Sequence, residues 1–265
     1  MKDAKWFMNQ VALVTGASGG LGAQIAIELA KRDVQLILVA RNMTKLEQVA
    51  AECQSFTTKP VDFYSCDLTD DVSIDELLGN LDASYKITMV INNAGLGYFK
   101  LAKDLSESEI SEMLQLNLNT LIKITQHFVP HFIEAKSGVI VNVASQAAKS
   151  ATAKSSVYSA TKFGVLGYSN ALRLELKPYG VHVITVNPGP IATDFFDKAE
   201  PTGKYLEQLG AVVLDPVKVA KEVVKGIEKE KREVNLPKTM NFASKLNVLF
   251  PKIGDKLLGS IFNKK

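Results

Sequence analysis

The chain has 265 residues, of which 46% are hydrophobic, and its formal net charge is +3 at pH 7. This length allows one large α/β domain or two small ones, and the apolar content is enough for a substantial core. Because acidic residues are interleaved with the basic ones along the chain, the charge favours a solvated surface over a nucleic-acid interface. The two cysteines, Cys53 and Cys66, are expected to be free thiols in a reducing compartment.

Targeting and membrane signals are weak. The first ten residues, MKDAKWFMNQ, are mixed in polarity and lack the apolar core of a signal peptide. No apolar run approaches the roughly 20 residues that span a bilayer. These observations predict a cytoplasmic protein.

Short runs rich in β-branched residues alternate with longer helical stretches, which is typical of a parallel sheet covered by helices on both faces. Strands are expected at 11–15, 34–40, 61–66, 88–92, 138–145, 181–189 and 233–237. The first expected helix runs from the glycine-rich turn to about residue 32, and the second follows Arg41 and ends near residue 55. Further helices are expected over 71–82, 106–135, 155–178 and 216–231, and in the C-terminal tail. The pattern predicts one α/β domain, 1–265, with a doubly wound parallel sheet, the Rossmann fold.

The helix that begins near 106 has a clear start signal. Ser106 and Glu109 have the spacing of a capping box, in which each side chain bonds the backbone amide of the other. We expect this helix to continue to about Ala135, with a disturbance at Pro130. Asn117 lies inside it although asparagine lowers helix propensity, which indicates a role for its side chain.

A glycine-rich turn, TGASGGLG at 15–22, joins the first strand to the following helix. Gly16, Gly20 and Gly22 allow the backbone to approach a pyrophosphate, and the helix N-terminus presents unpaired amides to the anion. No lysine follows the last glycine, which disfavours a triphosphate-binding loop. The neighbouring residues expected to contact the same dinucleotide are Ser18 and Leu21.

The end of the second strand indicates which coenzyme this turn holds. NAD sites place Asp or Glu there to accept a hydrogen bond from the ribose 2′-hydroxyl. This chain has Ala40 and then Arg41. A carboxylate that would repel a 2′-phosphate is therefore absent at this position, and the Arg41 guanidinium can pair with the phosphate. NADP(H) is therefore predicted, with NAD(H) as the alternative.

Tyr158 and Lys162 are four residues apart on a helix that begins near Ser155 or Ser156, so they share one face. A nearby ammonium stabilises a phenolate, so we expect the pKa of Tyr158 to be lowered toward neutrality. Such a phenol exchanges protons with a substrate oxygen. Ser145, at the end of the preceding strand, can hold the same oxygen. No histidine or G-x-S-x-G elbow accompanies it as an acyl nucleophile.

Six motifs in register resemble those of the short-chain dehydrogenase/reductase family, from about residue 10 to residue 237. They are TGASGGLG, NNAG at 92–95, Asn117, Ser145, Tyr158 with Lys162, and NPG at 187–189. The resemblance implies a catalytic tetrad of Asn117, Ser145, Tyr158 and Lys162. In that tetrad the family's role for Asn117 is to hold a proton-relay water beside Lys162.

The resemblance also implies coenzyme contacts at several strand ends. Tyr158 and Lys162 are expected to contact the coenzyme as well as the substrate, since the Lys162 ammonium can reach the nicotinamide ribose. The remaining expected contacts are Asp67, Leu68, Asn93, Ala94, Gly95, Pro188, Gly189, Ile191 and Thr193.

We therefore predict an NADP(H)-dependent oxidoreductase that interconverts a ketone, aldehyde or 3-oxo compound and its alcohol, with Tyr158 as proton donor or acceptor. One alternative is a 3-oxoacyl-thioester reductase of lipid synthesis. Another is a non-catalytic NADP-sensing protein, which has no need of a tuned tyrosine. His127 and His131 are four apart, but no third ligand is well placed, so no metal is expected.

Two further features concern partners and substrate. The small residues of the Tyr158 helix, Ala160, Gly164, Gly167 and Ala171, would let another helix come close. In the resembling family subunits pair there, which implies a homodimer or homotetramer. The substrate is expected to be selected by Tyr98, Phe99, the 146–156 loop and the 189–213 loop.

The C-terminal tail, 241–265, lies beyond the family motifs and carries apolar residues at helical spacing. They are Phe242, Leu246, Leu249 and Phe250, continued after Pro251 by Ile253, Leu257, Leu258, Ile261 and Phe262. Such a stripe must be buried somewhere. We expect it to pack on the enzyme or a partner subunit. A membrane surface, where lysines of the tail would meet anionic lipid, is the less favoured alternative.

Overall fold

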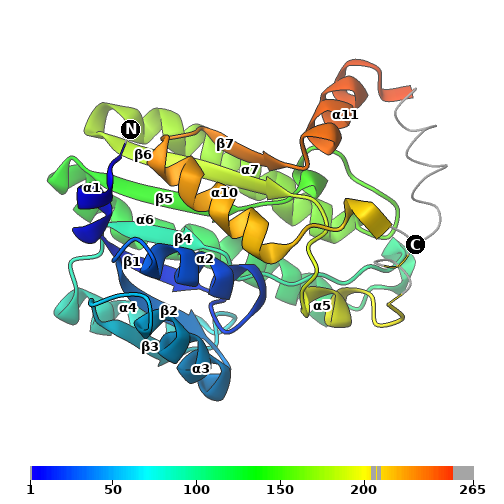
Figure 1. Ribbon diagram of the computed structural model, residues 1–265. Helices are drawn as coiled ribbons and strands as arrows, with labels where there is room; N and C mark the ends of the chain where they lie inside the picture. Colours follow the sequence, from blue (N-terminus) through cyan, green and yellow to red (C-terminus); the bar gives the residue numbers. More distant parts are fainter. Residues whose placement is uncertain (1, 204–206, 208–209, 253–265) are drawn as a thin grey trace.

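The computed structural model describes residues 2–203, 207 and 210–252, and its centre is one parallel sheet. The strands follow the order β3-β2-β1-β4-β5-β6-β7 (Figure 1). Their bounds are β1 (Val11–Thr15), β2 (Gln35–Ala40), β3 (Val61–Ser65), β4 (Met89–Asn92), β5 (Gly138–Val143), β6 (Val181–Pro188) and β7 (Glu233–Leu236). Because the order reverses between β1 and β4, the sheet is doubly wound, as predicted.

Helices cover both faces of this sheet (Figure 1). Their bounds are α1 (Ala4–Met8), α2 (Gly20–Ala30), α3 (Met43–Gln54), α4 (Asp71–Ser84), α5 (Glu107–Leu114), α6 (Thr120–Ala135), α7 (Ser156–Leu176), α8 (Phe195–Ala199), α10 (Pro216–Glu228) and α11 (Lys238–Leu249). On one face lie α2, α3 and α10, and on the other lie α4, α6 and α7. The sequence pattern did not predict α1, which buries Phe7 completely.

The core has two halves because successive side chains of each strand point to opposite faces. Val14 of β1 packs with the α2, α3 and α10 layer, whereas Leu13 packs with Phe128 of α6 on the other side. Both strand residues are fully buried. The strands are therefore continuous apolar runs, and the polar groups that follow them gather at one edge of the sheet.

The helix expected over 106–135 is interrupted, but not at its proline. The capping box is confirmed, since Glu109 N donates to Ser106 Oγ at 3.2 Å and Ser106 N donates to Glu109 Oε2 at 3.0 Å. A π-helical segment, η2 (Gln115–Asn119), separates α5 from α6. The expected disturbance at Pro130 is wrong, because α6 continues through it. Pro130 and Gln126, four residues earlier, are both exposed, so water can satisfy the carbonyl that the proline leaves unpaired.

In the part of the chain that the structure describes, no helix is both long and apolar enough to cross a bilayer. Within the same residues, no group of three or more His, Cys, Asp or Glu side chains is placed to hold a metal ion. His127 and His131 face Asp82, with His127 Nε2 2.9 Å from Asp82 Oδ2. Cys53 and Cys66 are both buried free thiols.

The small residues of α7 are only partly available for a subunit contact. A Cβ at Gly164 would lie 3.0 Å from a methyl group of Leu118, so the chain's own η2 segment already uses that position. Ala160, Gly167 and Ala171 are exposed. The homo-oligomer stays a prediction.

Candidate functional site

A cavity of about 890 Å³ opens at the carboxyl edge of the sheet, where parallel α/β folds bind their ligands. The turn between β1 and α2 forms one end of it, and α7 and α11 border the other. The predicted site residues that line it are Gly16, Ser18, Gly20, Leu21, Arg41, Asn93, Ala94, Gly95, Ser145, Tyr158, Lys162, Pro188, Gly189, Ile191 and Thr193. Four predicted residues lie outside this lining: Gly22, Asp67, Leu68 and Asn117.

The glycine-rich turn is shaped by close backbone contacts. Gly16 has φ +65°, and a Cβ there would lie 2.8 Å from Cα of Ala94. At Gly22 a Cβ would lie 2.3 Å from the carbonyl oxygen of Gly16, so this glycine lets α2 pack on the turn. Gly19 at the N-cap of α2 makes no side-chain cap, and it lines the cavity. The first turn of α2 therefore faces open space that suits an anion.

Asn93 fixes the β4 end against this turn. Its Nδ2 donates to the carbonyl oxygens of Thr15 and Gly16 at 3.0 and 3.2 Å. The Thr15 hydroxyl accepts from the amides of Asn93 and Ala94. Asn92 is also held by hydrogen bonds, because its Nδ2 donates to Thr125 Oγ1 and to Asn142 Oδ1 of β5. Both asparagine side chains thus hold strands together, and they leave the backbone at Ala94 and Gly95 along the cavity wall.

The far end of the cavity beyond the turn is cationic. Arg41 lines it after β2, and Lys45 lines it one helical turn later on α3. Lys45 Nζ lies 3.2 Å from Oδ2 of Asp194, which also lines the cavity, and both side chains are largely exposed. Sequence reasoning identified Arg41 and missed Lys45, because Arg41 precedes α3 and no helical spacing relates the two residues.

Asp67 and Leu68 have other partners. Asp67 Oδ1 accepts from the Thr69 amide and hydroxyl at 2.9 and 2.7 Å, and these bonds lower the pKa of Asp67, with a further contribution from Arg41. Leu68 is buried in the core, and its carbonyl accepts from Thr120 Oγ1 at 2.6 Å. The pair shapes the turn after β3, and its contact with a coenzyme stays a prediction.

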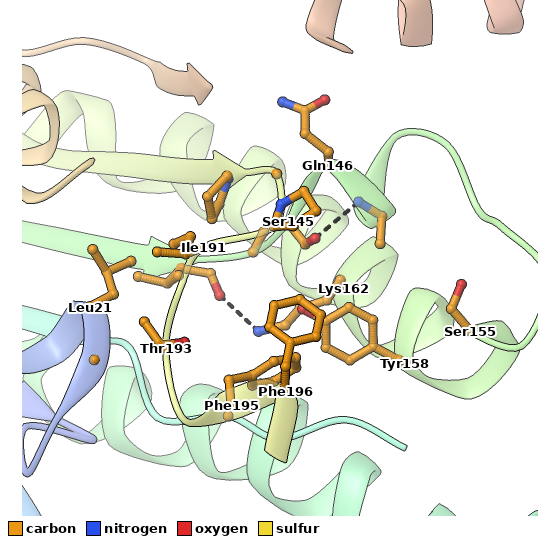
Figure 2. Close-up of a pocket in the computed structure, with 18 of the residues that line it drawn as sticks. Leu21, Ser145, Gln146, Ser155, Tyr158, Lys162, Ile191, Thr193, Phe195 and Phe196 are labelled. Carbon is orange, nitrogen blue, oxygen red and sulfur yellow. Dashed lines mark hydrogen bonds between the residues drawn. The ribbon is translucent and has the colours of Figure 1, made fainter. Parts of the chain in front are cut away.

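Ser145, Tyr158 and Lys162 surround one region of the cavity (Figure 2). Ser145 follows β5, its Oγ accepts from Ala147 N at 3.0 Å, and its hydroxyl also hydrogen-bonds Tyr158. Lys162 Nζ donates to the carbonyl oxygen of Val143 at 3.0 Å and lies 5.8 Å from the centre of the Tyr158 ring. Tyr158 and Lys162 therefore lie on one face of α7, as their four-residue spacing predicts.

The expected helix start near Ser155 or Ser156 is confirmed, because α7 begins at Ser156. Ser155 occupies the N-cap position of α7 but makes no side-chain cap. Its hydroxyl donates instead to the carbonyl oxygen of Thr152 at 2.7 Å and lies 3.0 Å from Ser159 Oγ. These bonds hold the loop that precedes Tyr158.

Burial is the largest cause of the pKa shifts of Tyr158 and Lys162. It raises the pKa of Tyr158 to about 12, and a hydrogen bond with Ser145 offsets part of that effect. Burial also lowers the pKa of Lys162 to about 8. The expected lowering of the Tyr158 pKa is wrong for this structure, because desolvation of the phenolate outweighs the stabilising groups around it. At neutral pH Tyr158 is therefore a phenol that holds a proton to give.

Asn117 reaches this region only indirectly. Its Oδ1 accepts from Leu96 N and its Nδ2 donates to Leu96 O, both at 2.8 Å, and Nδ2 also bonds Thr161 Oγ1 at 3.2 Å. The side chain is fully buried in the π-helical segment. Both backbone groups of Leu96 are thus held next to Gly95, whose Cβ would lie 3.4 Å from Lys162 Nζ. Asn117 positions the loop after β4, and its water-holding role stays a prediction.

An aromatic wall surrounds Tyr158. Its ring centre lies 5.6 Å from that of Phe99 and 5.8 Å from that of Phe195, and Phe196 of α8 lies 6.0 Å from Phe99. Figure 2 shows Phe195 and Phe196 near Tyr158. Gly97 permits this packing, since a Cβ there would meet Phe195 at 2.9 Å and Tyr158 at 3.2 Å. Sequence reasoning named Phe99 and the loop that contains α8, but not the two phenylalanines, because nothing in an irregular segment indicates side-chain direction.

Helix α11 completes the cavity beyond the aromatic wall. The lining residues that it and its C-terminal end contribute are Met240, Ala243, Ser244, Leu246, Asn247 and Phe250. The expected packing of the tail on the enzyme is confirmed in part, because Leu246 and Phe250 of the stripe line the cavity. Phe242 and Leu249 are 65% and 69% exposed, so for them packing on the chain itself is wrong, and packing on a partner subunit stays a prediction. The predicted continuation over 253–265 lies outside the described residues.

Comparisons with known proteins agree with this geometry. The profile of the family described as short chain dehydrogenase matches residues 10–203. Dehydrogenase/reductase SDR family member 7 of Mus musculus is 34% identical over 72% of this chain, and that match spans 58% of the mouse protein. The D-threitol dehydrogenase of Mycolicibacterium smegmatis is 34% identical over 76% of this chain and 78% of its own.

A solved structure is similar over almost the whole chain. It is a short-chain dehydrogenase from Sphingobium yanoikuyae in complex with NADPH, with a TM-score of 0.81 and 26% sequence identity. The similarity covers 94% of this chain and 95% of that one. The chain therefore belongs to the short-chain dehydrogenase family, and it is an oxidoreductase.

Proposed function

We propose that this short-chain dehydrogenase interconverts a carbonyl compound and its alcohol with NADP(H), using Tyr158 as the proton donor in reduction. The observation that carries the proposal is the convergence of Ser145, Tyr158 and Lys162 in a cavity that also contains the glycine-rich turn. The residues fit a dinucleotide, because Gly16 and Gly22 allow backbone approach that a Cβ would block and the uncapped α2 N-terminus faces the space.

The bound coenzyme supplies or accepts the hydride. Tyr158 gives the proton of its phenol to the substrate oxygen in reduction, and Ser145 donates a hydrogen bond to the same oxygen. The Ser145 hydroxyl, which hydrogen-bonds Tyr158 in the structure, would turn to the substrate oxygen while its own oxygen keeps accepting from Ala147 N. Lys162 is largely protonated at neutral pH with its pKa of about 8. Its charge stabilises the phenolate that remains after the transfer.

The coenzyme preference follows from the cationic end of the cavity. Arg41 and Lys45 both line it, and Ala40 stands where NAD sites carry a carboxylate. Two cations near a ribose 2′-position favour a phosphate over a hydroxyl. We therefore propose NADP(H) in preference to NAD(H). The NADPH in the Sphingobium yanoikuyae structure supports this choice.

The substrate end of the cavity is apolar. Phe99, Phe195 and Phe196 stand around Tyr158, and Met240, Leu246 and Phe250 extend the wall. A polyhydroxylated substrate would leave its hydroxyls unpaired against such a wall, which costs free energy for each group. We propose a ketone, aldehyde or 3-oxo compound with an apolar substituent, although a relative is named for D-threitol.

The test is NADPH consumption with a panel of carbonyl compounds. The panel contains an aromatic ketone, a straight-chain aliphatic ketone, a 3-oxoacyl thioester and, for the reverse reaction, D-threitol. Turnover of the apolar ketones, lost in Tyr158→Phe, supports the proposal. Turnover of the thioester alone would favour the lipid-synthesis alternative. Binding of NADPH without turnover of any compound would favour a sensor and contradict the proposal.

A further inference from the structure

Helix α11 has its polar side against the protein and its apolar side outward. Asn241 Oδ1 accepts from Lys149 Nζ at 3.1 Å, Asn247 Nδ2 donates to Ser150 Oγ at 3.3 Å, and Ser244 is 4% exposed. Surface helices of soluble proteins show the opposite arrangement, with the apolar stripe on the core. Hydrogen bonds and Met240, which lines the cavity, therefore hold this helix on the enzyme, whereas Phe242 and Leu249 are mostly exposed.

The outward side of the helix forms a continuous apolar patch, which we name the α11 patch. Phe242, Leu246, Leu249 and Phe250 follow one another at spacings of four, three and one residues, and they are between 43% and 69% exposed. Figure 1 shows α11 at one end of the molecule, away from the centre of the sheet. Four large hydrophobic side chains on one exposed helix are unusual for a surface that faces water alone.

The charged residues of this helix and of the two residues after Phe250 have one sign. Lys238 and Lys245 are exposed and seven residues apart, so two turns of helix place them along the same side as Phe242. Lys252 follows the helix and is exposed as well. No acidic residue occurs between 238 and 252. A helix with an apolar sector edged by lysines matches the surface of a bilayer with anionic headgroups.

The α11 patch is continuous with the lining of the cavity. Leu246 and Phe250 belong to the patch and also line the cavity. Val212, which lines it too, is 41% exposed. An apolar path therefore leads from the patch to the wall of Phe99 and Phe195 around Tyr158.

We propose that the α11 patch docks on the surface of an anionic lipid bilayer, with Phe242 and Leu249 among the acyl chains and the lysines at the headgroups. Docked in this way, the cavity mouth opens at the lipid surface. A second copy of this chain is a poorer occupant, because pairing through the same face would bring lysines of both copies together without carboxylates to neutralise them. Docking does not depend on the proposed reaction, whereas delivery of an apolar substrate from the lipid does.

The experiment is vesicle sedimentation of the full chain. The vesicles are phosphatidylcholine alone or phosphatidylcholine mixed with phosphatidylglycerol. We expect the protein to pellet with the mixed vesicles and to be released at high salt in part only, because the apolar contact remains. Phe242→Ser/Leu249→Ser should weaken partitioning at least about 100-fold, as two large side chains no longer enter the lipid. Lys238→Gln/Lys245→Gln should weaken it about 30-fold, and only for the anionic vesicles.

Matched controls separate docking from general surface effects. Leu174→Ser removes an equally exposed leucine, 70% exposed, from α7. Lys218→Gln/Lys221→Gln removes two exposed lysines from α10. Both controls should pellet like the unmodified protein. Neither Phe242 nor Leu249 lines the cavity, so turnover of a water-soluble ketone should be unchanged in their double variant.

Three results would overturn the proposal. One is an unmodified protein that stays in the supernatant with both kinds of vesicle. Another is equal pelleting of the protein and Phe242→Ser/Leu249→Ser. The third is a smaller oligomer for that double variant than for the unmodified protein, measured as molar mass by light scattering. That result would make the patch a contact between copies. A failure of the proposed reaction looks different, because it abolishes turnover of the soluble ketone and leaves sedimentation intact.

Discussion

The ammonium of Lys162 donates a hydrogen bond to the carbonyl oxygen of Val143, 3.0 Å away, at the carboxyl end of β5. Val143 precedes Ser145 by two residues, so this bond holds the ammonium close to Ser145 and beside the ring of Tyr158. Lys162 is only 4% exposed. One carbonyl does not replace the water that an ammonium loses, and the pKa of Lys162 accordingly falls to about 8. The catalytic arrangement is therefore expected to reduce the stability of the fold.

Lys162→Met is expected to be inactive and more stable at neutral pH. The fall of the Lys162 pKa from 10.5 to about 8 corresponds to about 3 kcal/mol of destabilisation at pH 7. The lost bond to Val143 O offsets about 1–2 kcal/mol of it. The free energy of unfolding from urea titrations at pH 7 should therefore rise by about 1–2 kcal/mol.

The sign of the pH dependence follows from the same pKa. Between pH 8 and 10.5 the folded protein has lost the Lys162 proton and the unfolded chain still binds it, so the stability of the unmodified protein rises with pH. The advantage of Lys162→Met should disappear toward pH 10. Lys221→Met, an exposed lysine on α10, should show no such trend. An advantage of the same size at both pH values would contradict the assignment.

Tyr158→Phe is expected to lose turnover by about 100- to 10,000-fold, because a positioned general acid contributes that much. The ring and its packing on Phe99 and Phe195 remain, so the melting temperature and NADPH affinity should change little. Tyr168→Phe makes the same chemical change on the same helix, outside the cavity lining, and should keep full activity. Tyr158→Phe with most of its turnover would exclude Tyr158 as the proton donor.

Local patterns predicted most of the fold and the position of the site. The seven strands follow from β-branched runs separated by helical stretches, and parallel pairing brings their carboxyl ends to one edge. The glycine-rich turn, Ser145, Tyr158 and Lys162 all lie within motifs whose spacing is local. Their meeting in one cavity required only the doubly wound order that the alternating pattern already indicated.

Features that depend on distant partners were not predictable in the same way. The π-helical segment exists around Asn117, which bonds Leu96, a residue 21 positions earlier. Periodicity found α11 but not its orientation, because its polar side is held by Lys149, 92 positions before Asn241. The pKa of Tyr158 was misjudged because the neighbouring lysine is visible in the sequence, whereas the burial around the phenol is not.

Arg41→Ala is expected to raise the KM for NADPH about 10- to 100-fold with little change for NADH. A charge-assisted contact with a 2′-phosphate contributes about 1.5–3 kcal/mol, and NADH lacks that phosphate. Lys45→Ala should act in the same direction more weakly, because Lys45 also pairs with Asp194. Steady-state kinetics with both coenzymes provide the comparison within each variant. Equal kcat/KM for the two coenzymes in the unmodified protein would show that Arg41 does not select the 2′-phosphate.

Asn117→Ala is expected to reduce both stability and turnover. It removes the partners of Leu96 N and Leu96 O, and each buried backbone group left unpaired costs about 1–3 kcal/mol. Urea titrations should therefore show a loss of about 2–4 kcal/mol.

Asn119→Ala is the matched control for this change. Asn119 lies in the same π-helical segment and is exposed, and among the described residues its side chain bonds Gln115 Oε1 through Nδ2, so its loss should stay within about 0.5 kcal/mol. Turnover of Asn117→Ala is then measured at a temperature where that variant is fully folded. A kcat that remains low there, with unchanged NADPH affinity, means that Asn117 positions the loop beside Lys162 for the reaction itself. Normal kcat in the folded variant would limit Asn117 to holding the fold.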